Sequence, residues 1–158
     1  MLQPLRRGFH RVDPLIAGWM RRWGHDLLRW SLAVVFIWFG ILKPFGYSEA
    51  NKLIAETVYW AVDPAWFIVV LGWWEVAIGV CMLFRPLIRL AILLLALQMG
   101  GTFMPLVLVP DATWNAAPWW PTIEGQYIIK NLVIIAAAIA VGGTVRRRGE
   151  GSATDKHR

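Results

Sequence analysis

A single carboxylate, Glu75, interrupts the apolar stretch LGWWEVAIGVCMLF at residues 71–84. It follows Pro64 by roughly 16 Å of helix, which places it near the middle of a bilayer. A carboxylate facing lipid at that depth would cost at least a few kcal/mol, so we expect Glu75 to face other helices. It could be half of a structural ion pair, a neutral acid hydrogen-bonded to Gln98, or a proton relay, because burial favours the neutral form.

Small residues share the predicted helical face of Glu75. Gly72 and Gly79 stand three and four residues from it, and small residues let a neighbouring helix approach closely. Gln98 lies near the midpoint of another apolar run and offers an amide to any carboxylate turned inward. The pattern therefore predicts a polar cluster inside a helical bundle.

Two lysines could reach this cluster from the outer half of the membrane. Lys43 stands near the outer end of the first apolar run, and Lys130 follows the start of the last, beside Asn131. Either amine could bend toward Glu75 or extend to the outer surface, as lysines near the end of a span do. Glu124 could complement a helix N-terminal dipole or pair with Lys43. Glu75, Lys130 and Lys43 are the predicted catalytic residues.

Aromatic side chains form the last group of candidates. Trp38, Trp73 and Trp74 are expected deep in their spans, where packing or lipid contact is the default and lining a flat apolar ligand is the alternative. Tyr127 falls on one helical stripe with Lys130 and Asn131. The predicted ligand-binding residues are Gln98, Asn131, Tyr127, Trp38, Trp73, Trp74 and Glu124.

The composition identifies the environment of these residues. The chain is 58% hydrophobic and contains 11 Trp, and its mean hydropathy of +0.51 is typical of an integral membrane protein. The net charge of +6 is better explained by lysines and arginines on the cytoplasmic side than by nucleic-acid binding. The chain has one cysteine, Cys81, and its histidines are confined to basic terminal segments, so we predict no intrinsic cofactor and no metal site.

Four stretches are long and apolar enough to cross a bilayer as helices, at about residues 27–45, 64–84, 87–109 and 126–143. We therefore predict an all-α polytopic membrane protein, a four-transmembrane-helix bundle with short interfacial helices. Residues 27–144 would form the membrane domain, with an amphipathic cytoplasmic segment before it at 1–26. A basic, disordered cytoplasmic tail would follow it at 145–158.

The positive charges predict the orientation of the bundle. With both termini in the cytoplasm, only Lys43, Lys52 and Lys130 lie toward the outer side. The remaining lysines and arginines lie inside: Arg6, Arg7, Arg11, Arg21, Arg22, Arg29, Arg85, Arg89, Arg146, Arg147, Arg148, Lys156 and Arg158. This asymmetry agrees with an even number of spans and with a bacterial inner-membrane protein whose termini are cytoplasmic.

Three segments outside the spans have patterns of their own. DPLIAGWMRRWGHD would begin a helix with Asp13 as N-cap and Pro14 at the first position, lying on the cytoplasmic surface or leading obliquely into the first span. YSEANKLIAETVYW would form a short outer helix capped by Ser48. The loop VPDATWNAAPWWPTIEG, rich in Pro and Trp, would be an ordered outer cap over the bundle.

Four segments of the chain resemble the DoxX-like family of small four-helix membrane proteins. They are RWSLAVVFIWFGILKPFGYSEA, GWWEVAIGVCMLF, LLLALQMGGTFMPLVL and EGQYIIKNLVIIAAAIAVGG. The order of a Lys closing the first helix, a Gly-x-x-Glu in the second and a Lys opening the fourth carries the resemblance. The family's common Lys-Asp is here Lys130-Asn131, which removes one acid. The resemblance implies a four-helix bundle linked to redox physiology, such as a subunit of a thiosulfate:quinone oxidoreductase or a partner in an oxidant-resistance complex.

Three functions remain open at this point. The first is a membrane subunit or accessory of a quinone-linked oxidoreductase, with a quinone head group or a small anion held by Lys43 and Lys130 and a proton exchanged by Glu75. Because the chain has no redox centre of its own, electrons would pass through the quinone or through a cofactor held by a soluble redox partner protein. The second is a small proton-coupled transporter, which could be a homo-oligomer, and the third is a non-catalytic scaffold whose buried cluster only specifies helix packing.

Overall fold

A computed structural model describes the backbone of residues 3–154 and the side chains of residue 14 and of residues 16–144. Four helical stretches have the length and composition to cross a membrane: Ile16–Leu42, Pro64–Leu83, Arg85–Leu108 and Ile123–Thr144. The predicted all-α, four-helix membrane architecture is confirmed. Each stretch is helical because a segment in lipid must satisfy its backbone hydrogen bonds internally. It is apolar on most sides because its side chains meet lipid.

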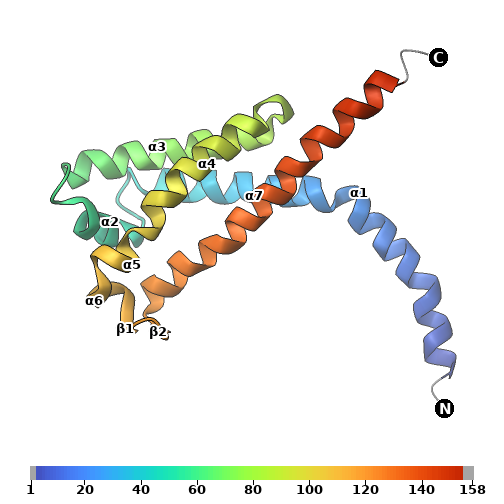
Figure 1. Ribbon diagram of the computed structural model, residues 1–158, viewed down its shortest axis with the longest axis horizontal. Coiled ribbons are helices and arrows are strands. Elements are labelled where there is room, and N and C mark those ends of the chain that lie inside the picture. The colour runs from blue at the N-terminus through green and yellow to red at the C-terminus, as the bar shows by residue number, and fades with distance from the viewer. Residues whose placement is uncertain (1–2, 155–158) are drawn as a thin grey trace.

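The elements follow one another along the chain as a bundle with a structured cap at one end. In order they are α1 (Gln3–Leu42), α2 (Ala50–Val58), α3 (Pro64–Leu83), η1 (Arg85–Leu87), α4 (Ile88–Phe103), α5 (Pro105–Leu108), α6 (Pro110–Thr113), β1 (Trp114–Ala116), β2 (Trp120–Pro121) and α7 (Ile123–Thr154). Figure 1 shows α2, α5, α6 and the antiparallel β1–β2 hairpin gathered at one end, which we call the α2 end. The opposite end, where η1 joins α3 to α4, is the η1 end.

Helices α1 and α3 pack with their backbones very close together. A Cβ added to Gly40 would lie 2.8 Å from the Gly72 carbonyl oxygen, and one added to Gly72 would lie 2.6 Å from Pro44. At Gly79 it would meet Ile37 at 2.6 Å and the Ala33 carbonyl oxygen at 2.8 Å. The predicted role of Gly72 and Gly79 in close helix approach is therefore confirmed.

An apolar core fills the half of the bundle between Glu75 and the η1 end. It is contributed by all four long helices: Leu32, Ala33 and Phe36 of α1, Ile78 and Met82 of α3, Ile88, Ala91, Leu95 and Met99 of α4, and Ala138 and Val141 of α7. Because these side chains come from four separate helices, their van der Waals packing helps to hold the bundle together.

The start of the first helix differs from the prediction. Helix α1 begins at Gln3 and contains Pro14 in its interior, so the predicted N-terminus at Asp13 is wrong. A proline removes one backbone hydrogen bond but leaves the chain on both sides of it free to stay helical. Figure 1 shows α1 bending and leaning away from the bundle in its N-terminal part, in agreement with an oblique lead into the first span.

The α2 end contains the predicted short helix and the predicted ordered loop. Helix α2 is present, but Glu49 precedes it without a side-chain cap, so the cap expected from Ser48 is not formed. In the loop, Thr122 Oγ1 donates to Ala112 O at 2.7 Å and accepts from Gly125 N at 3.2 Å. The latter bond satisfies one of the free N–H groups at the start of α7 and ties the loop to that helix.

Helix α7 is longer than the predicted fourth span. It continues past residue 143 to Thr154, so residues 145–154 of the tail that the sequence predicts to be disordered have a helical backbone here. Residues 155–158 of that tail, and the first two residues of the predicted N-terminal segment, lie outside the described residues.

Candidate functional site

A polar cluster lies inside the bundle around Glu75. Glu75 Oε2 accepts a hydrogen bond from Lys43 Nζ at 2.5 Å, and Oε1 accepts one from Gln98 Nε2 at 2.6 Å. Three helical segments meet here, because Lys43 directly follows α1, Glu75 belongs to α3 and Gln98 to α4. The structure thus brings together three of the predicted site residues, Lys43, Glu75 and Gln98, which we call the Glu75 cluster.

The end of α1 aims Lys43 at the carboxylate. The helix ends at Leu42, and the chain turns through Gly46, whose φ of +78° is a conformation that favours glycine. Asn51 Nδ2 donates to the Lys43 carbonyl oxygen at 3.1 Å and so ties α2 to this turn. The contact between Gly40 and Gly72, one turn from each partner, sets the helix separation that a short Lys43–Glu75 bond requires.

The Glu75 cluster is almost closed to its surroundings. Lys43 is 7% exposed and Glu75 is 8% exposed. One ammonium and one carboxylate make its formal charge zero, which is how a pair of ions can persist at this depth. Two buried acceptors near it, Gln98 Oε1 and Asn51 Oδ1, have no donor among the described residues, while an ammonium has three N–H groups to offer.

Lys130 lies outside the Glu75 cluster. It is exposed on the side of α7, and its amine lies 4.8 Å from the centre of the Tyr127 ring. Since Tyr127 is one turn closer to the α2 end, this position corresponds to a lysine extending toward the membrane surface. Asn131 Nδ2 donates to the Ile128 carbonyl oxygen of its own helix at 3.1 Å. Glu124 is exposed in the first turn of α7, where a carboxylate complements the helix dipole.

The three tryptophans do not line a common site. Trp38 is 65% exposed and Trp73 is 56% exposed, so both face the surroundings of the bundle. Trp74 packs against the core, and its Nε1 donates to the Leu94 carbonyl oxygen at 3.2 Å. Two of the three tryptophans thus lie on the outer surface of the bundle, and the third packs inside it.

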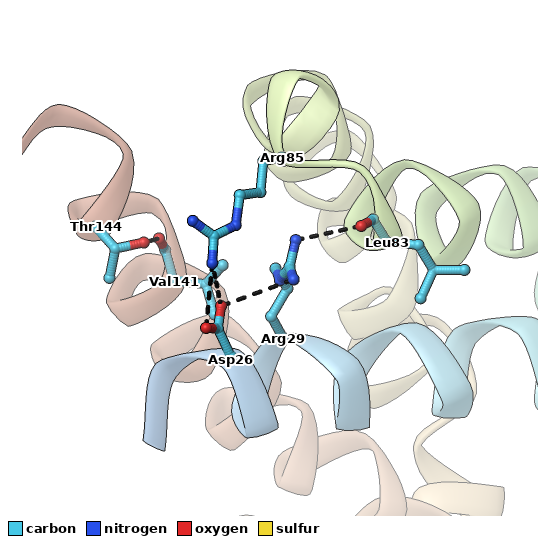
Figure 2. Close-up of polar contacts among 6 residues, drawn as sticks. All are labelled: Asp26, Arg29, Leu83, Arg85, Val141 and Thr144. Carbon is cyan, nitrogen blue, oxygen red and sulfur yellow. Dashed lines mark hydrogen bonds and ion pairs between the residues drawn. The ribbon is translucent and has the colours of Figure 1, made fainter. Parts of the chain in front are cut away.

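A second charged group lies near the η1 end and was not singled out from the sequence. In Figure 2, Arg85 reaches Asp26 with 3.2 Å between Arg85 Nη2 and both carboxylate oxygens, and Arg29 lies 3.7 Å from the same carboxylate. Arg29 is 6% exposed and donates to the Leu83 carbonyl oxygen at 3.2 Å, at the C-terminal end of α3. The signal was available, since Asp26 and Arg29 are three residues apart and Arg85 lies between two spans on the same side.

Groups of metal ligands and pockets are two other features that could form a site in the described part of the chain. Among the residues described there, no three His, Cys, Asp or Glu side chains gather as a metal site. An open pocket of about 480 Å³ lies at the α2 end, lined by Ala55, Glu56, Tyr59, Pro64, Leu108 and Val109. It is one turn of α2 away from Asn51.

The fold and the Glu75 cluster together define a class: a multi-pass, four-helix membrane protein with an ion pair buried between its helices. No protein-family model, curated protein or solved structure matches the chain. The resemblance to the DoxX-like family therefore stays a prediction from the sequence.

Proposed function

We propose that this protein is an integral membrane component of a quinone-linked oxidoreductase or oxidant-resistance system, with the Glu75 cluster as its working site. The observation that carries the proposal is the buried carboxylate held between an ammonium at 2.5 Å and an amide at 2.6 Å. Buried ionisable side chains within a membrane are costly and mark functional sites by default. The DoxX-like motifs point to the same redox setting.

The chemistry of quinone reduction suits these three side chains. A quinone that becomes a quinol takes up electrons and protons in equal number, so its site needs hydrogen-bond donors for the oxygens and a group that passes protons. Lys43 and Gln98 are the donors, and Glu75 accepts a proton from the aqueous side and passes it to the reduced oxygen. The electrons come from a soluble redox partner, whose own cofactor is oxidised in the same step.

The position of Lys130 favours a quinone over a small anion as the proposed ligand. With Lys130 outside the cluster, one amine faces one carboxylate, and the site has no excess positive charge to attract a small anion such as thiosulfate. A neutral head group that exchanges hydrogen bonds with Lys43 and Gln98 is the better match. Homo-oligomer formation is not needed to complete the cluster, since all three residues belong to one chain.

Ligand binding in nanodiscs tests this proposal. A fluorescent or radiolabelled quinol should bind saturably to the wild type, and Glu75→Gln should abolish binding while circular dichroism shows the helices intact. Lys130→Met is the matched control, because it removes a lysine at the same end of the bundle but outside the cluster, and it should bind as the wild type does. Absence of saturable binding, or equal binding by Glu75→Gln, would reject the quinone site.

One observation favours a second candidate, a non-catalytic scaffold. Both oxygens of Glu75 already have partners within the chain, as expected of an ion pair whose role is to specify how α1, α3 and α4 pack. The scaffold would recruit soluble partners through its basic face. In that case Glu75→Gln lowers stability but changes no ligand binding.

The proposed setting is the bacterial inner membrane with both termini in the cytoplasm. This orientation is supported by the excess of lysines and arginines on the side of the termini and of the η1 end. It turns the α2 end, with α2 and the hairpin, toward the outer compartment.

A further inference from the structure

We infer that Glu75 exchanges protons with water at the α2 end only, along a hydrated polar line formed by Lys43, Gln98 and Asn51. The inference rests on the Glu75 cluster being the working site proposed above and adds the side from which its protons come. Two features carry it: the buried acceptors of Gln98 and Asn51, which have no donor among the described residues, and an apolar layer between Glu75 and the η1 end.

The polar side begins at Gln98 and Asn51. Their carbonyl oxygens, Gln98 Oε1 and Asn51 Oδ1, are buried, and no donor of the described residues reaches either of them. A buried acceptor without a partner costs about 1–3 kcal/mol, which favours water where other polar groups can also bind it. Lys43 supplies such groups. Its ammonium has three N–H groups, and the bond to Glu75 uses one of them.

Asn51 continues this line toward the surface. It bonds to the Lys43 carbonyl oxygen, and Ala55, one turn along α2, lines the open pocket at the α2 end. Residues four apart share a helical face, so the pocket and Asn51 lie on the same side of α2. Water entering the pocket thus has one helical turn to cover before it meets the first buried polar group.

The opposite direction is closed. The buried polar residues among those described are Arg29, Lys43, Thr57, Glu75 and Thr113. Only Arg29 belongs to the η1 end. Its Nε is also buried without a partner among the described residues, but Leu83, whose carbonyl it binds, is roughly 12 Å of helix beyond Glu75. Ile78 and Met82 of α3 and Ala33 of α1 lie in the interval and are each 0% exposed. A close-packed apolar layer of this kind holds no water.

The charged and polar groups around Glu75 leave no other route. From α1 the group that faces it is Lys43, and from α4 it is Gln98. On α7, Lys130 stacks on Tyr127 and Asn131 bonds to a carbonyl oxygen of its own helix instead. In the proposed orientation, Glu75 would therefore take protons from the outer compartment, and a proton-coupled transporter would have to open the layer around Ile78 in a second state.

Cysteine accessibility in the full-length protein tests the direction. In a Cys81→Ser background, Asn51→Cys and Gln98→Cys are exposed to sulfonatoethyl methanethiosulfonate, and separately to silver ions, from one face of oriented vesicles. Thiols still free are then counted after denaturation. Tyr47→Cys, in the turn before α2, and Phe84→Cys, beside η1, report which face is which, so the assay does not depend on the proposed orientation. Ala91→Cys, which places a thiol within the apolar layer, is the matched control.

We expect Asn51→Cys and Gln98→Cys to lose their free thiol when a reagent is on the Tyr47 face and to keep it when the reagent is on the Phe84 face. Ala91→Cys should keep its thiol from both faces. Loss of the Gln98→Cys thiol from the Phe84 face, or its protection from silver on both faces, would overturn the inference. No quinone is present in this assay, so failed quinol binding would reject the proposed function and leave this result standing.

Discussion

Glu75 shows what an ionisable side chain needs in order to stay in the apolar middle of a helical bundle. Each carboxylate oxygen has one short hydrogen bond, and the ammonium that provides one of them cancels the charge. Removing the charge pair from water costs several kcal/mol per ion, which good geometry and added hydrogen bonds must offset. The amide of Gln98 provides the added hydrogen bond, so its contribution to stability should exceed that of a polar side chain in a neutral hydrogen bond.

The first prediction concerns Gln98. Gln98→Leu removes the donor to Glu75 Oε1, and we expect the free energy of unfolding in mixed micelles to fall by about 1.5–3 kcal/mol, the value of a hydrogen bond to a charged group. Lys130→Met is the control and should change it by less than about 1 kcal/mol, because only an exposed cation–π contact is lost. A loss as large in the control as in Gln98→Leu would contradict the assignment.

The sequence predicted the members of the cluster but not the choice between the two lysines. Depth along each helix put Lys43 and Lys130 at similar distances from Glu75, and depth does not report the rotation of a helix about its axis. Tyr127, Lys130 and Asn131 share one stripe of α7, but a polar stripe can face either a buried cluster or the outer surface, so the pattern did not indicate which face is buried. Only packing, with Ile128, Ala138 and Val141 turned inward, shows that Lys130 faces out.

At the scale of the elements, glycines decide how close α1 and α3 can come. The Gly40–Gly72 contact places backbone against backbone one turn from Lys43 and Glu75. A longer helix separation would stretch the ion pair, so the apolar contact and the polar contact depend on each other. The periodicity of Gly72, Glu75 and Gly79 made this predictable from the sequence, because the three residues share one helical face.

The second prediction tests this dependence with a single methyl group. Gly72→Ala would place a Cβ 2.6 Å from Pro44, so the helices must shift, and we expect a loss of about 1–3 kcal/mol in the free energy of unfolding. Gly100→Ala in α4 is the matched control, because a Cβ there meets nothing within 4 Å. It should be neutral or stabilising by up to about 1 kcal/mol. Equal effects of the two variants would show that the close approach of α1 and α3 does not contribute to the free energy of unfolding.

Helix boundaries were harder to predict than helix packing. Pro14 predicted a helix start, yet α1 runs through it from Gln3. Ser48 predicted a cap, yet the chain enters α2 through Glu49 without one. Both residue types favour a boundary only locally, and the continuation of the helix on either side depends on neighbours that a local pattern does not include.

The whole molecule is divided into two unlike ends. The α2 end holds the short helices, the hairpin and the polar line to Glu75, while the η1 end holds the apolar core and the Asp26–Arg85 contact. Figure 1 shows the start of α1 and the end of α7 on the side away from α2. An even number of spans explains this arrangement and fixes a relation between the termini, whichever compartment they face.

The third prediction follows from that relation. Reporter proteins fused separately to the N-terminus and the C-terminus should report the same compartment, because four spans return the chain to its starting side. In the proposed orientation, a fluorescent protein should be active and a periplasmic phosphatase inactive at both ends. Reports from opposite compartments would require an odd number of spans and would contradict the fold.

The pairing of Lys43 with Glu75 inside the bundle is tested most directly by a double-mutant cycle. The free energy of unfolding in mixed micelles is measured for the wild type, Lys43→Met, Glu75→Gln and the double variant. Each single change leaves the other group buried without its partner and should cost about 3–5 kcal/mol. The double variant should lose less than the sum of the two by more than about 1 kcal/mol. Losses that add within about 0.5 kcal/mol would mean that the two groups do not interact, and would contradict the account.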